Sequence, residues 1–119
     1  MAADPNAAAR AFLAEDPDPE TRAELQDLLG RAEGGDEGAR PELADRFSGP
    51  LEFGTAGLRG RVEAGLARMN RLVVMKATRG LGAHLLEEGA GGGPDPRGRG
   101  VTLGFDGRRS SRQLAEDAA

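Results

Sequence analysis

The segment GTAGLRG, residues 54–60, contains the residue types that a phosphate contact needs. Its three glycines allow backbone N–H groups to approach an anion, and Thr55 adds a hydroxyl donor. Arg59 supplies a planar guanidinium that can donate to two phosphate oxygens at once. The segment is neither a Walker A loop nor a GxGxxG dinucleotide fingerprint. A glycine-rich turn with a solvated arginine would look the same, so the phosphate interpretation needs support from elsewhere in the chain.

A basic series begins in this segment and continues to Arg79, with Glu63 as the only acidic residue among its members. It could attract a polyanion, and nucleic acid is one candidate. The only aromatic residues in the second half of the chain, Phe53 and Phe105, lie in strand-like apolar alternations rather than on a stacking surface. A solvated face or attraction of a small anion is therefore favoured over nucleic acid. The members of the series are Arg59, Arg61, Arg68, Arg71, Lys76 and Arg79.

The second candidate anion site is DGRRSS, residues 106–111, which lies between a predicted strand and a predicted helix. Ligands gather at the carboxyl ends of strands in open α/β sheets, and helix N-termini attract anions. An Asp-Gly turn followed by a serine cap explains the same residues without any ligand. Ser110 and Ser111 have no nearby base, so neither is expected to act as a nucleophile.

Metal and thiol chemistry are not expected in this chain. Cysteine is absent, which excludes disulfides, thiol nucleophiles and cysteine-ligated metals. The single histidine, His84, has no catalytic companion and is expected to lie on the surface or in packing. Asp16, Asp18 and Glu20 could in principle bind a metal, but they alternate with two prolines, and a helix-capping role is favoured.

Composition predicts one small domain at most, with a thin core. The chain has 119 residues and a net charge of −4, and it contains no isoleucine. Acidic residues dominate residues 1–50 and basic residues dominate residues 51–119, so the two parts are expected to do different jobs. No apolar run suggests a secretory signal or a membrane span, which favours a cytoplasmic protein without a membrane partner.

The acidic part is predicted to form short helices separated by turns. Asp18 and Pro19 suit the N-cap and first position of a helix that reaches Gly30, with Leu25, Leu28 and Leu29 on one face. Residues 33–39 are predicted to be a mobile loop, and a short helix is predicted from Pro41 to Phe47. The sequence Ser-Gly-Pro at 48–50 closes this part.

The basic part is predicted to alternate strands and helices. A strand begins at residues 51–53, and the three glycines of GTAGLRG argue against a regular element there. Asn70 is expected to cap a long helix over residues 71–88. A flexible loop over 89–100 leads to a strand over 101–105, a turn, and a helix running to residue 119 that Ser110 and Gln113 would cap.

The chain contains four motifs, LEFGTAGLRG at 51–60, ARMN at 67–70, ATRGLGAHL at 77–85 and VTLGFDGRRSSRQLAEDAA at 101–119. Together they resemble the first domain of the α-D-phosphohexomutase superfamily. They occur in the family's order, and more narrowly they are similar to the phosphoglucomutase/phosphomannomutase branch with its phosphopentomutase-like members. The resemblance implies an α/β fold, with residues 1–50 as an acidic helical N-terminal extension and 51–119 as an incomplete first domain of a four-domain enzyme.

The resemblance also implies a reaction. Family members move a phosphoryl group reversibly between the 1-position and the terminal hydroxyl of a sugar, through an enzyme phosphoserine and a bisphosphate intermediate. Mg²⁺ is the implied cofactor and a sugar 1,6-bisphosphate the implied activator. By position, Thr55 and Arg59 match phosphate- or substrate-contacting residues, and Arg108 matches the arginine of a DGR turn that supports the catalytic loop. Nothing is transferred to Lys76 or Arg79.

The departures from the family pattern limit the expected activity. The 119 residues contain no T-A-S-H-N-P-like phosphoserine loop, no D-G-D-x-D-R magnesium loop and no sugar-binding loop. We therefore expect no catalytic residue and no metal ligand in this chain, which resembles an N-terminal fragment that is inactive alone. The alternative is a standalone anion-binding or interaction module without catalysis. Neither the sugar (glucose, mannose or a pentose) nor the oligomeric state can be read from these residues.

Overall fold

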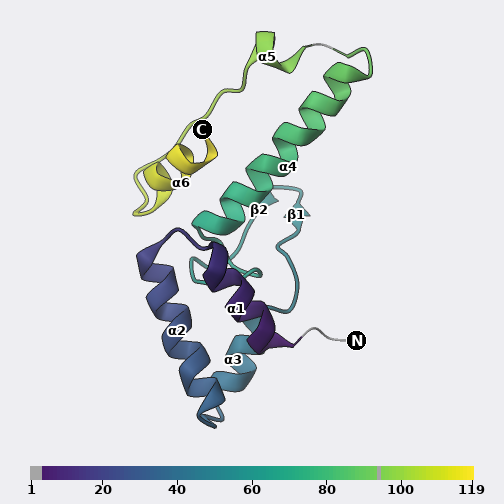
Figure 1. The fold of residues 1–119 in the computed structure, drawn as a ribbon. Helices are drawn as coiled ribbons and strands as arrows, with labels where there is room; N and C mark the ends of the chain where they lie inside the picture. Colours follow the sequence, from purple (N-terminus) through teal and green to yellow (C-terminus); the bar gives the residue numbers. More distant parts are fainter. Residues whose placement is uncertain (1–3, 94) are drawn as a thin grey trace. The chain divides into compact units, whose positions relative to one another are not determined.

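The computed structural model describes residues 4–93 and 95–119 (Figure 1). Residues up to 73 form one unit and residues 74–119 a second, and each is described by itself. The described part is mostly helical with a two-stranded sheet, and the α/β class is confirmed. The helices are α1 (Pro5–Glu15), α2 (Pro19–Glu33), α3 (Ala39–Arg46), α4 (Arg71–Ala90), α5 (Pro96–Arg99) and α6 (Ser111–Ala118), and the strands are β1 (Phe53–Gly54) and β2 (Gly57–Leu58).

Helices α1 and α2 begin in the same way, with an aspartate before a proline. The Asp4 carboxylate accepts from the Asn6 N–H at 3.0 Å, and the Asp18 carboxylate accepts from the Glu20 N–H at 2.9 Å. The prediction that α2 starts at Pro19 is confirmed, but its predicted end at Gly30 is wrong. The apolar face continues to Ala32, which is buried, and this burial stabilises the helix beyond Gly30.

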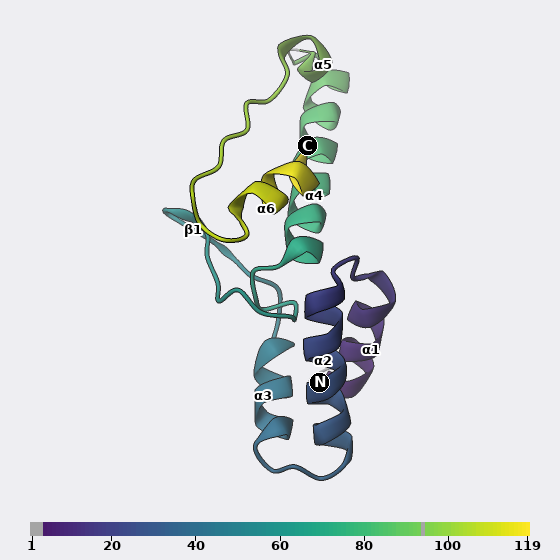
Figure 2. The same ribbon diagram turned by 90° about the vertical axis from the view of Figure 1, so that its left-hand side faces the viewer.

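The three N-terminal helices contact one another and enclose the core of the first unit (Figure 2). Leu25 and Leu43 are 0% and 1% exposed, and Leu28 lies beside them in the same cluster. Phe12 of α1 meets Phe47 edge-to-face, with ring centroids 5.8 Å apart. The predicted leucine face of α2 is therefore confirmed as the centre of a small core.

A short turn joins α2 to α3, where a mobile loop was predicted over 33–39. Asp36 organises the turn, because its carboxylate accepts from the Gly38 N–H at 2.9 Å and from the Ala39 N–H at 3.2 Å. Helix α3 consequently begins at Ala39, two residues before the predicted start at Pro41. Pro41 then lies in the first turn of the helix, where a missing N–H removes no helical hydrogen bond.

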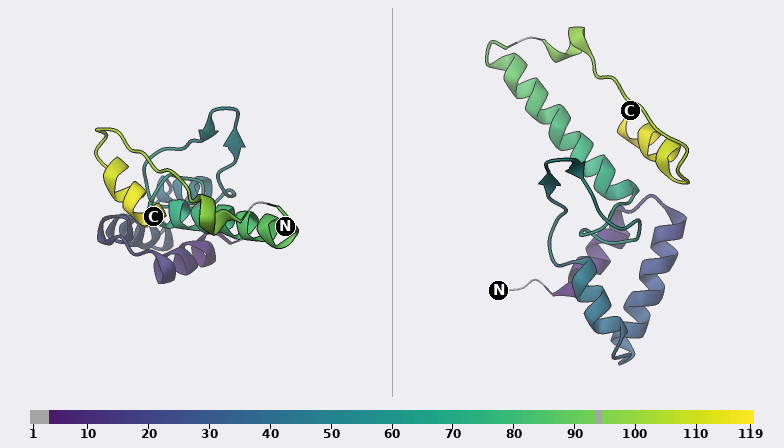
Figure 3. Two further views of the ribbon diagram at one scale, coloured as in Figure 1. Left: turned by 90° about the horizontal axis from the view of Figure 1, so that it is seen from above. Right: turned by 180° about the vertical axis from the view of Figure 1, so that it is seen from behind.

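Strands β1 and β2 form an antiparallel hairpin, in which Phe53 pairs with Leu58 and Gly54 with Gly57. The prediction that GTAGLRG lacks regular structure is wrong for these residues. Thr55 and Ala56 make the turn, and Gly57 follows with φ of +95°, a conformation that favours glycine. The hairpin extends away from the three helices of its unit (Figure 3).

Helix α4 begins where Asn70 was predicted to cap it. The side-chain oxygen of Asn70 accepts from the Val73 N–H at 3.0 Å, and its amide nitrogen donates to the carbonyls of Glu63 and Gly65. The helix ends at Ala90, within two residues of the prediction. Within the described residues, no helix has the length and apolar character needed to cross a membrane.

The predicted strand over 101–105 is wrong. These residues form no regular element, and Val101 and Phe105 are 64% and 60% exposed. A strand requires a hydrogen-bonded neighbour, and the described residues supply none here. The loop predicted over 89–100 contains the one-turn helix α5.

Helix α6 forms as predicted but without the predicted capping box. The Ser110 side chain makes no cap hydrogen bond, and Gln113 donates to Asp117 at 2.9 Å instead of reaching back. The Ser111 hydroxyl accepts from the Asp106 N–H at 3.2 Å, which ties the turn to the helix.

Candidate functional site

The hairpin carries two of the three predicted site residues. Thr55 lies in its turn and Arg59 directly follows β2, and both side chains are exposed. Arg59 makes no hydrogen bond or ion pair within the residues that the structure describes. The fold therefore presents a hydroxyl and a guanidinium from one small element, both available to an anion.

The base of the hairpin is fixed although its tip is exposed. Leu51 and Leu58 pack against the core of the first unit. A Cβ at Gly60 would lie 2.9 Å from the Leu51 side chain, so glycine permits this close approach. The Met69 N–H donates to the Arg61 carbonyl at 2.8 Å and closes the segment that follows. Arg59 thus extends from an anchored backbone.

Arg108, the third predicted residue, belongs to the second unit and lies in the turn before α6. Its Nε is 3.1 Å from a carboxylate oxygen of Asp106, and its backbone N–H donates to the other oxygen. The hydrogen bond from the Arg108 backbone lowers the pKa of Asp106; desolvation opposes this, and the Ser111 hydroxyl and the Arg108 charge add to the lowering. The predicted turn is confirmed, and in it an aspartate holds an exposed arginine.

The basic series is not a continuous free surface. Arg68 is buried, with 6% of its surface exposed, and it lies 3.0 Å from Glu63 and 2.5 Å from Asp45. Arg61 lies 3.3 Å from Glu63. The interpretation of all six residues as an anion-attracting series is therefore wrong for Arg68, whose charge is neutralised inside the first unit.

A second buried arginine, Arg46 of α3, was not recognised in the sequence. It is 8% exposed and lies 3.0 Å from Glu24 and 2.9 Å from Glu42. The spacing of Glu42 and Arg46 by four residues on one helix is a signal that sequence alone contains. The contact with Glu24 is not, because 22 residues separate the two positions.

The ion pairs of Arg46, Arg61 and Arg68 with nearby carboxylates form a network that shifts the pKa of two of its members. The carboxylates are those of Glu24, Glu42, Asp45 and Glu63. Burial alone would raise the pKa of Glu63, but the hydrogen bond from Arg68 and the charges of Arg46, Arg61 and Arg68 outweigh it, so the pKa falls below its ordinary value. Burial would likewise lower the pKa of Arg68, but hydrogen bonds to Asp45 and Glu63 raise it. Both groups are therefore charged at neutral pH.

Glu63 should make the stability of the chain pH-dependent in acid. Its folded-state pKa is lowered, so its stabilising contribution is complete above the ordinary glutamate pKa of about 4.3 and is lost as the pH falls through the lower folded value. We expect the urea midpoint of the wild type to exceed that of Glu63→Gln at pH 7, and the difference to shrink below about pH 4. A constant difference across this range would contradict the assignment.

The remaining polar candidates have structural roles. Asp16 accepts from the Thr21 hydroxyl at 2.5 Å and from the Asp18 N–H at 3.0 Å, so it fixes the corner between α1 and α2. His84 is exposed and lies 3.3 Å from Glu88 on the same helix, so of the two expected positions, surface or packing, it takes the surface one. No group of three possible metal ligands occurs among the described residues.

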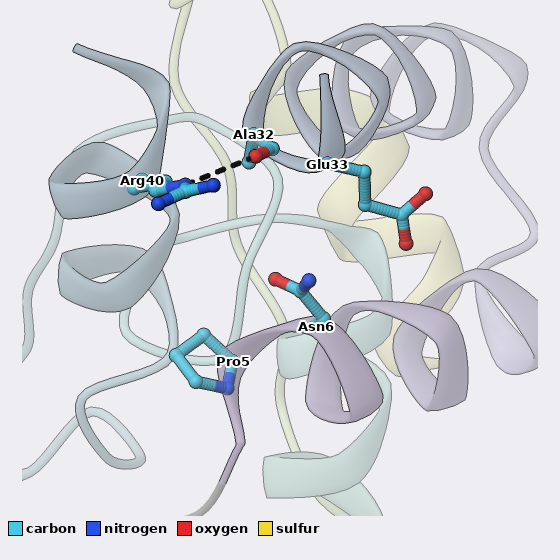
Figure 4. Close-up of a pocket in the computed structure, with 5 residues that line it drawn as sticks. All are labelled: Pro5, Asn6, Ala32, Glu33 and Arg40. Carbon is cyan, nitrogen blue, oxygen red and sulfur yellow. Dashed lines mark hydrogen bonds between the residues drawn. The ribbon is translucent and has the colours of Figure 1, made fainter. Parts of the chain in front are cut away.

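A surface hollow of about 410 Å³ lies elsewhere in the first unit (Figure 4). Its lining includes Asn6, Glu33 and Arg40, and the Arg40 Nε donates to the Ala32 carbonyl at 3.3 Å. None of the residues predicted to contact phosphate lines it. The hollow is therefore separate from the candidate site on the hairpin.

The comparisons with known proteins identify the class. Residues 50–119 match the family model described as phosphoglucomutase/phosphomannomutase, alpha/beta/alpha domain I. The chain belongs to this family, within the α-D-phosphohexomutase superfamily. Its relatives include proteins named phosphopentomutase and phosphoribomutase, and no solved structure shows significant similarity to it.

Three relatives define the similarity more closely. The chain is 39% identical over 88 residues to phosphopentomutase of Mus musculus, which covers 69% of this chain and 14% of that protein. It is 37% identical over 78 residues to phosphoribomutase of Saccharomyces cerevisiae, which covers 66% and 12%. It is 32% identical over 111 residues to glucose 1,6-bisphosphate synthase of Homo sapiens, which covers 88% and 16%. The chain thus spans about one seventh of the length of the relatives it matches.

Proposed function

We propose that this chain contributes the first phosphate contact of a phosphosugar mutase. In this proposal Thr55 and Arg59 bind a phosphate of a sugar phosphate, and Arg108 supports the catalytic loop. The observation that carries it is the exposed Arg59, without a partner among the described residues, on an anchored hairpin in a family of phosphosugar mutases. Its guanidinium can donate to two equatorial oxygens and stabilise their charge during transfer.

The complete reaction that we propose interconverts a sugar 1-phosphate with a sugar 6-phosphate or 5-phosphate. An enzyme phosphoserine donates its phosphoryl group, and a sugar bisphosphate is the intermediate. Phosphoryl transfer depends mainly on positioning and charge stabilisation, which is the task proposed for Arg59. The phosphoserine and sugar loops are absent from these 119 residues, so we expect the chain alone to be inactive.

The proposed cofactor and partners follow from the same family. Mg²⁺ and an activating sugar 1,6-bisphosphate belong to the proposed reaction, but the described residues offer no ligand set that fits Mg²⁺. No step is therefore assigned to the metal in this chain. A sugar phosphate is preferred to nucleic acid as partner, since Arg68 is buried and Arg61 is paired with Glu63. We place the protein in the cytoplasm, without a membrane partner.

Titration of the ¹⁵N-labelled chain with glucose 1-phosphate tests the phosphate contact. We expect the amide shifts to change most between Thr55 and Arg59, and the changes to disappear in Arg59→Ala, because the guanidinium supplies two of the donors. Glucose, which lacks the phosphate, is the control ligand. Shifts that are identical in the wild type and in Arg59→Ala would remove Arg59 from the site. The same sample should form no glucose 6-phosphate above background when Mg²⁺ and glucose 1,6-bisphosphate are added.

A further inference from the structure

The carboxylate of Glu24 joins the helical region to the segment that follows the hairpin. Glu24 lies in the middle of α2, and its Oε2 accepts from the Ala64 N–H at 2.6 Å. The same oxygen accepts from the Arg46 guanidinium at 3.0 Å. Ala64 is 0% exposed and the Glu24 side chain is 42% exposed, so a partly exposed carboxylate here binds a buried backbone N–H 40 residues away.

Residues 64–67 wrap around the end of α3. The Arg46 guanidinium donates to the Ala64 carbonyl at 3.3 Å, and the Arg46 carbonyl accepts from the Ala67 N–H at 2.9 Å. Gly65 passes so close that a Cβ there would lie 2.7 Å from the Arg46 carbonyl oxygen. Side chain and backbone of Arg46 are therefore both bonded to this segment.

The wrapped segment is continuous with the backbone of Arg59. Arg61 is held to Met69 by the 2.8 Å hydrogen bond, and Val62 forms a parallel bridge with Met69. Gly60 packs against Leu51 on the other side. Ala64, which binds Glu24 and Arg46, lies only five residues after Arg59. A shift of the backbone at Ala64 can therefore change the position of Arg59 through the hydrogen-bonded residues between them.

We propose that Glu24 is a positioning residue for the phosphate contact. It fixes residues 60–69 against α2 and α3, and in this way it sets the direction in which Arg59 extends. Helices α2 and α3 of the acidic part would then support the phosphate contact directly, rather than form an independent extension. This inference rests on the proposed function of Arg59 as a phosphate contact.

The test measures the affinity of Arg59 for inorganic phosphate in variants of the chain, by NMR of its Nε–Hε group. In Glu24→Ala, the Ala64 N–H and the Arg46 guanidinium lose a shared acceptor, and we expect the Kd to rise at least about fivefold because the guanidinium is less well oriented. Glu24→Gln retains an acceptor oxygen at the same place and should stay within about twofold of the wild type.

Two matched variants separate positioning from a loss of stability. Glu20→Ala removes an exposed acidic residue from the same helix, and Ala32→Gly weakens α2 without touching the Glu24 contacts. Both should keep the wild-type Kd at temperatures where circular dichroism shows every variant folded. A Kd that rises equally in Ala32→Gly would show that general stability is responsible and would overturn the proposal.

The remaining outcomes distinguish this inference from the proposed function. If the wild type binds phosphate through Arg59 and Glu24→Ala binds equally well, the positioning role is wrong and the phosphate contact stands. If the wild type shows no phosphate binding that depends on Arg59, the proposed function and the inference built on it both fall.

Discussion

Replacing Arg46 with alanine should lower the free energy of unfolding by about 3 kcal/mol, because it empties a buried site and leaves the buried Ala64 carbonyl and the partly exposed Glu24 and Glu42 without their shared donor. Arg46 is 8% exposed, and its guanidinium is bonded to Glu24, Glu42 and the Ala64 carbonyl. Two of these partners come from helices and the third from the segment after the hairpin. Urea unfolding followed by circular dichroism at pH 7 measures the change.

An exposed arginine of the same region provides the control. Arg31 lies 3.0 Å from Asp27 at a spacing of four residues on α2, and about half of its side chain is exposed. Such a surface pair contributes about 0.5 kcal/mol or less, so Arg31→Ala should be nearly neutral. If both variants lost the same free energy of unfolding, the burial and hydrogen bonds of Arg46 would not contribute more to stability than an exposed ion pair.

Gly65→Ala should destabilise the chain by about 3 kcal/mol, since two costs combine at this position. The backbone φ of +131° is one that alanine rarely adopts, and a Cβ would lie 2.7 Å from the Arg46 carbonyl oxygen. That oxygen also accepts the hydrogen bond from Ala67, so relief of the clash would break this bond. Thermal and urea unfolding of the purified variant measure the loss.

Gly30→Ala is the matched substitution, with an expected effect of opposite sign. Gly30 lies within α2, and a Cβ there would meet nothing within 4 Å. Alanine in a helix interior is favoured over glycine by about 0.5–1 kcal/mol, so this variant should be more stable than the wild type. Destabilisation by Gly30→Ala, or tolerance of Gly65→Ala, would contradict the local geometry described above.

Local signals predicted the helices well. Asp18 with Pro19 marks the start of α2, and Asn70 marks the start of α4, because each side chain satisfies N–H groups of the first helical turn within a few residues. The leucine face of α2 was equally readable, since its spacing is set by the helix itself. Where local signals failed, as at Gly30, burial of the next apolar residue decided the outcome.

Signals that depend on distant partners were not readable. The alternation of Val101, Leu103 and Phe105 predicted a strand, but a strand also needs a neighbour that its own residues do not encode. The hairpin was missed because a high glycine content suggested irregular backbone. Arg46 and Arg68 were not recognised as buried residues. Each has an acidic residue nearby in the sequence, but burial also depends on distant partners, Glu24 for Arg46 and Asp45 for Arg68.

For the candidate site, residue chemistry was the readable part. The sequence indicated Thr55 and Arg59 as hydrogen-bond donors to a phosphate. The structure places Thr55 in the turn of one exposed hairpin and Arg59 directly after it, and the proposed phosphate contact is tested by the titration described above. The sequence did not indicate the support beneath them, because Glu24 and Ala64 meet only after the helices and the later segment have packed. Chemistry can thus be read residue by residue, whereas the framework that directs it depends on tertiary contacts.

The segment over residues 101–105 affects the solubility of the chain. Val101, Leu103 and Phe105 are exposed, and the backbone between them has amide and carbonyl groups that no described strand covers. Such a segment is a template onto which another copy can add as a strand, and its alternating apolar side chains favour stacking once strands have paired. We therefore expect this chain to aggregate through residues 101–105 at high concentration. The substitution Leu103→Lys should reduce this aggregation, because it places a charge within the apolar segment.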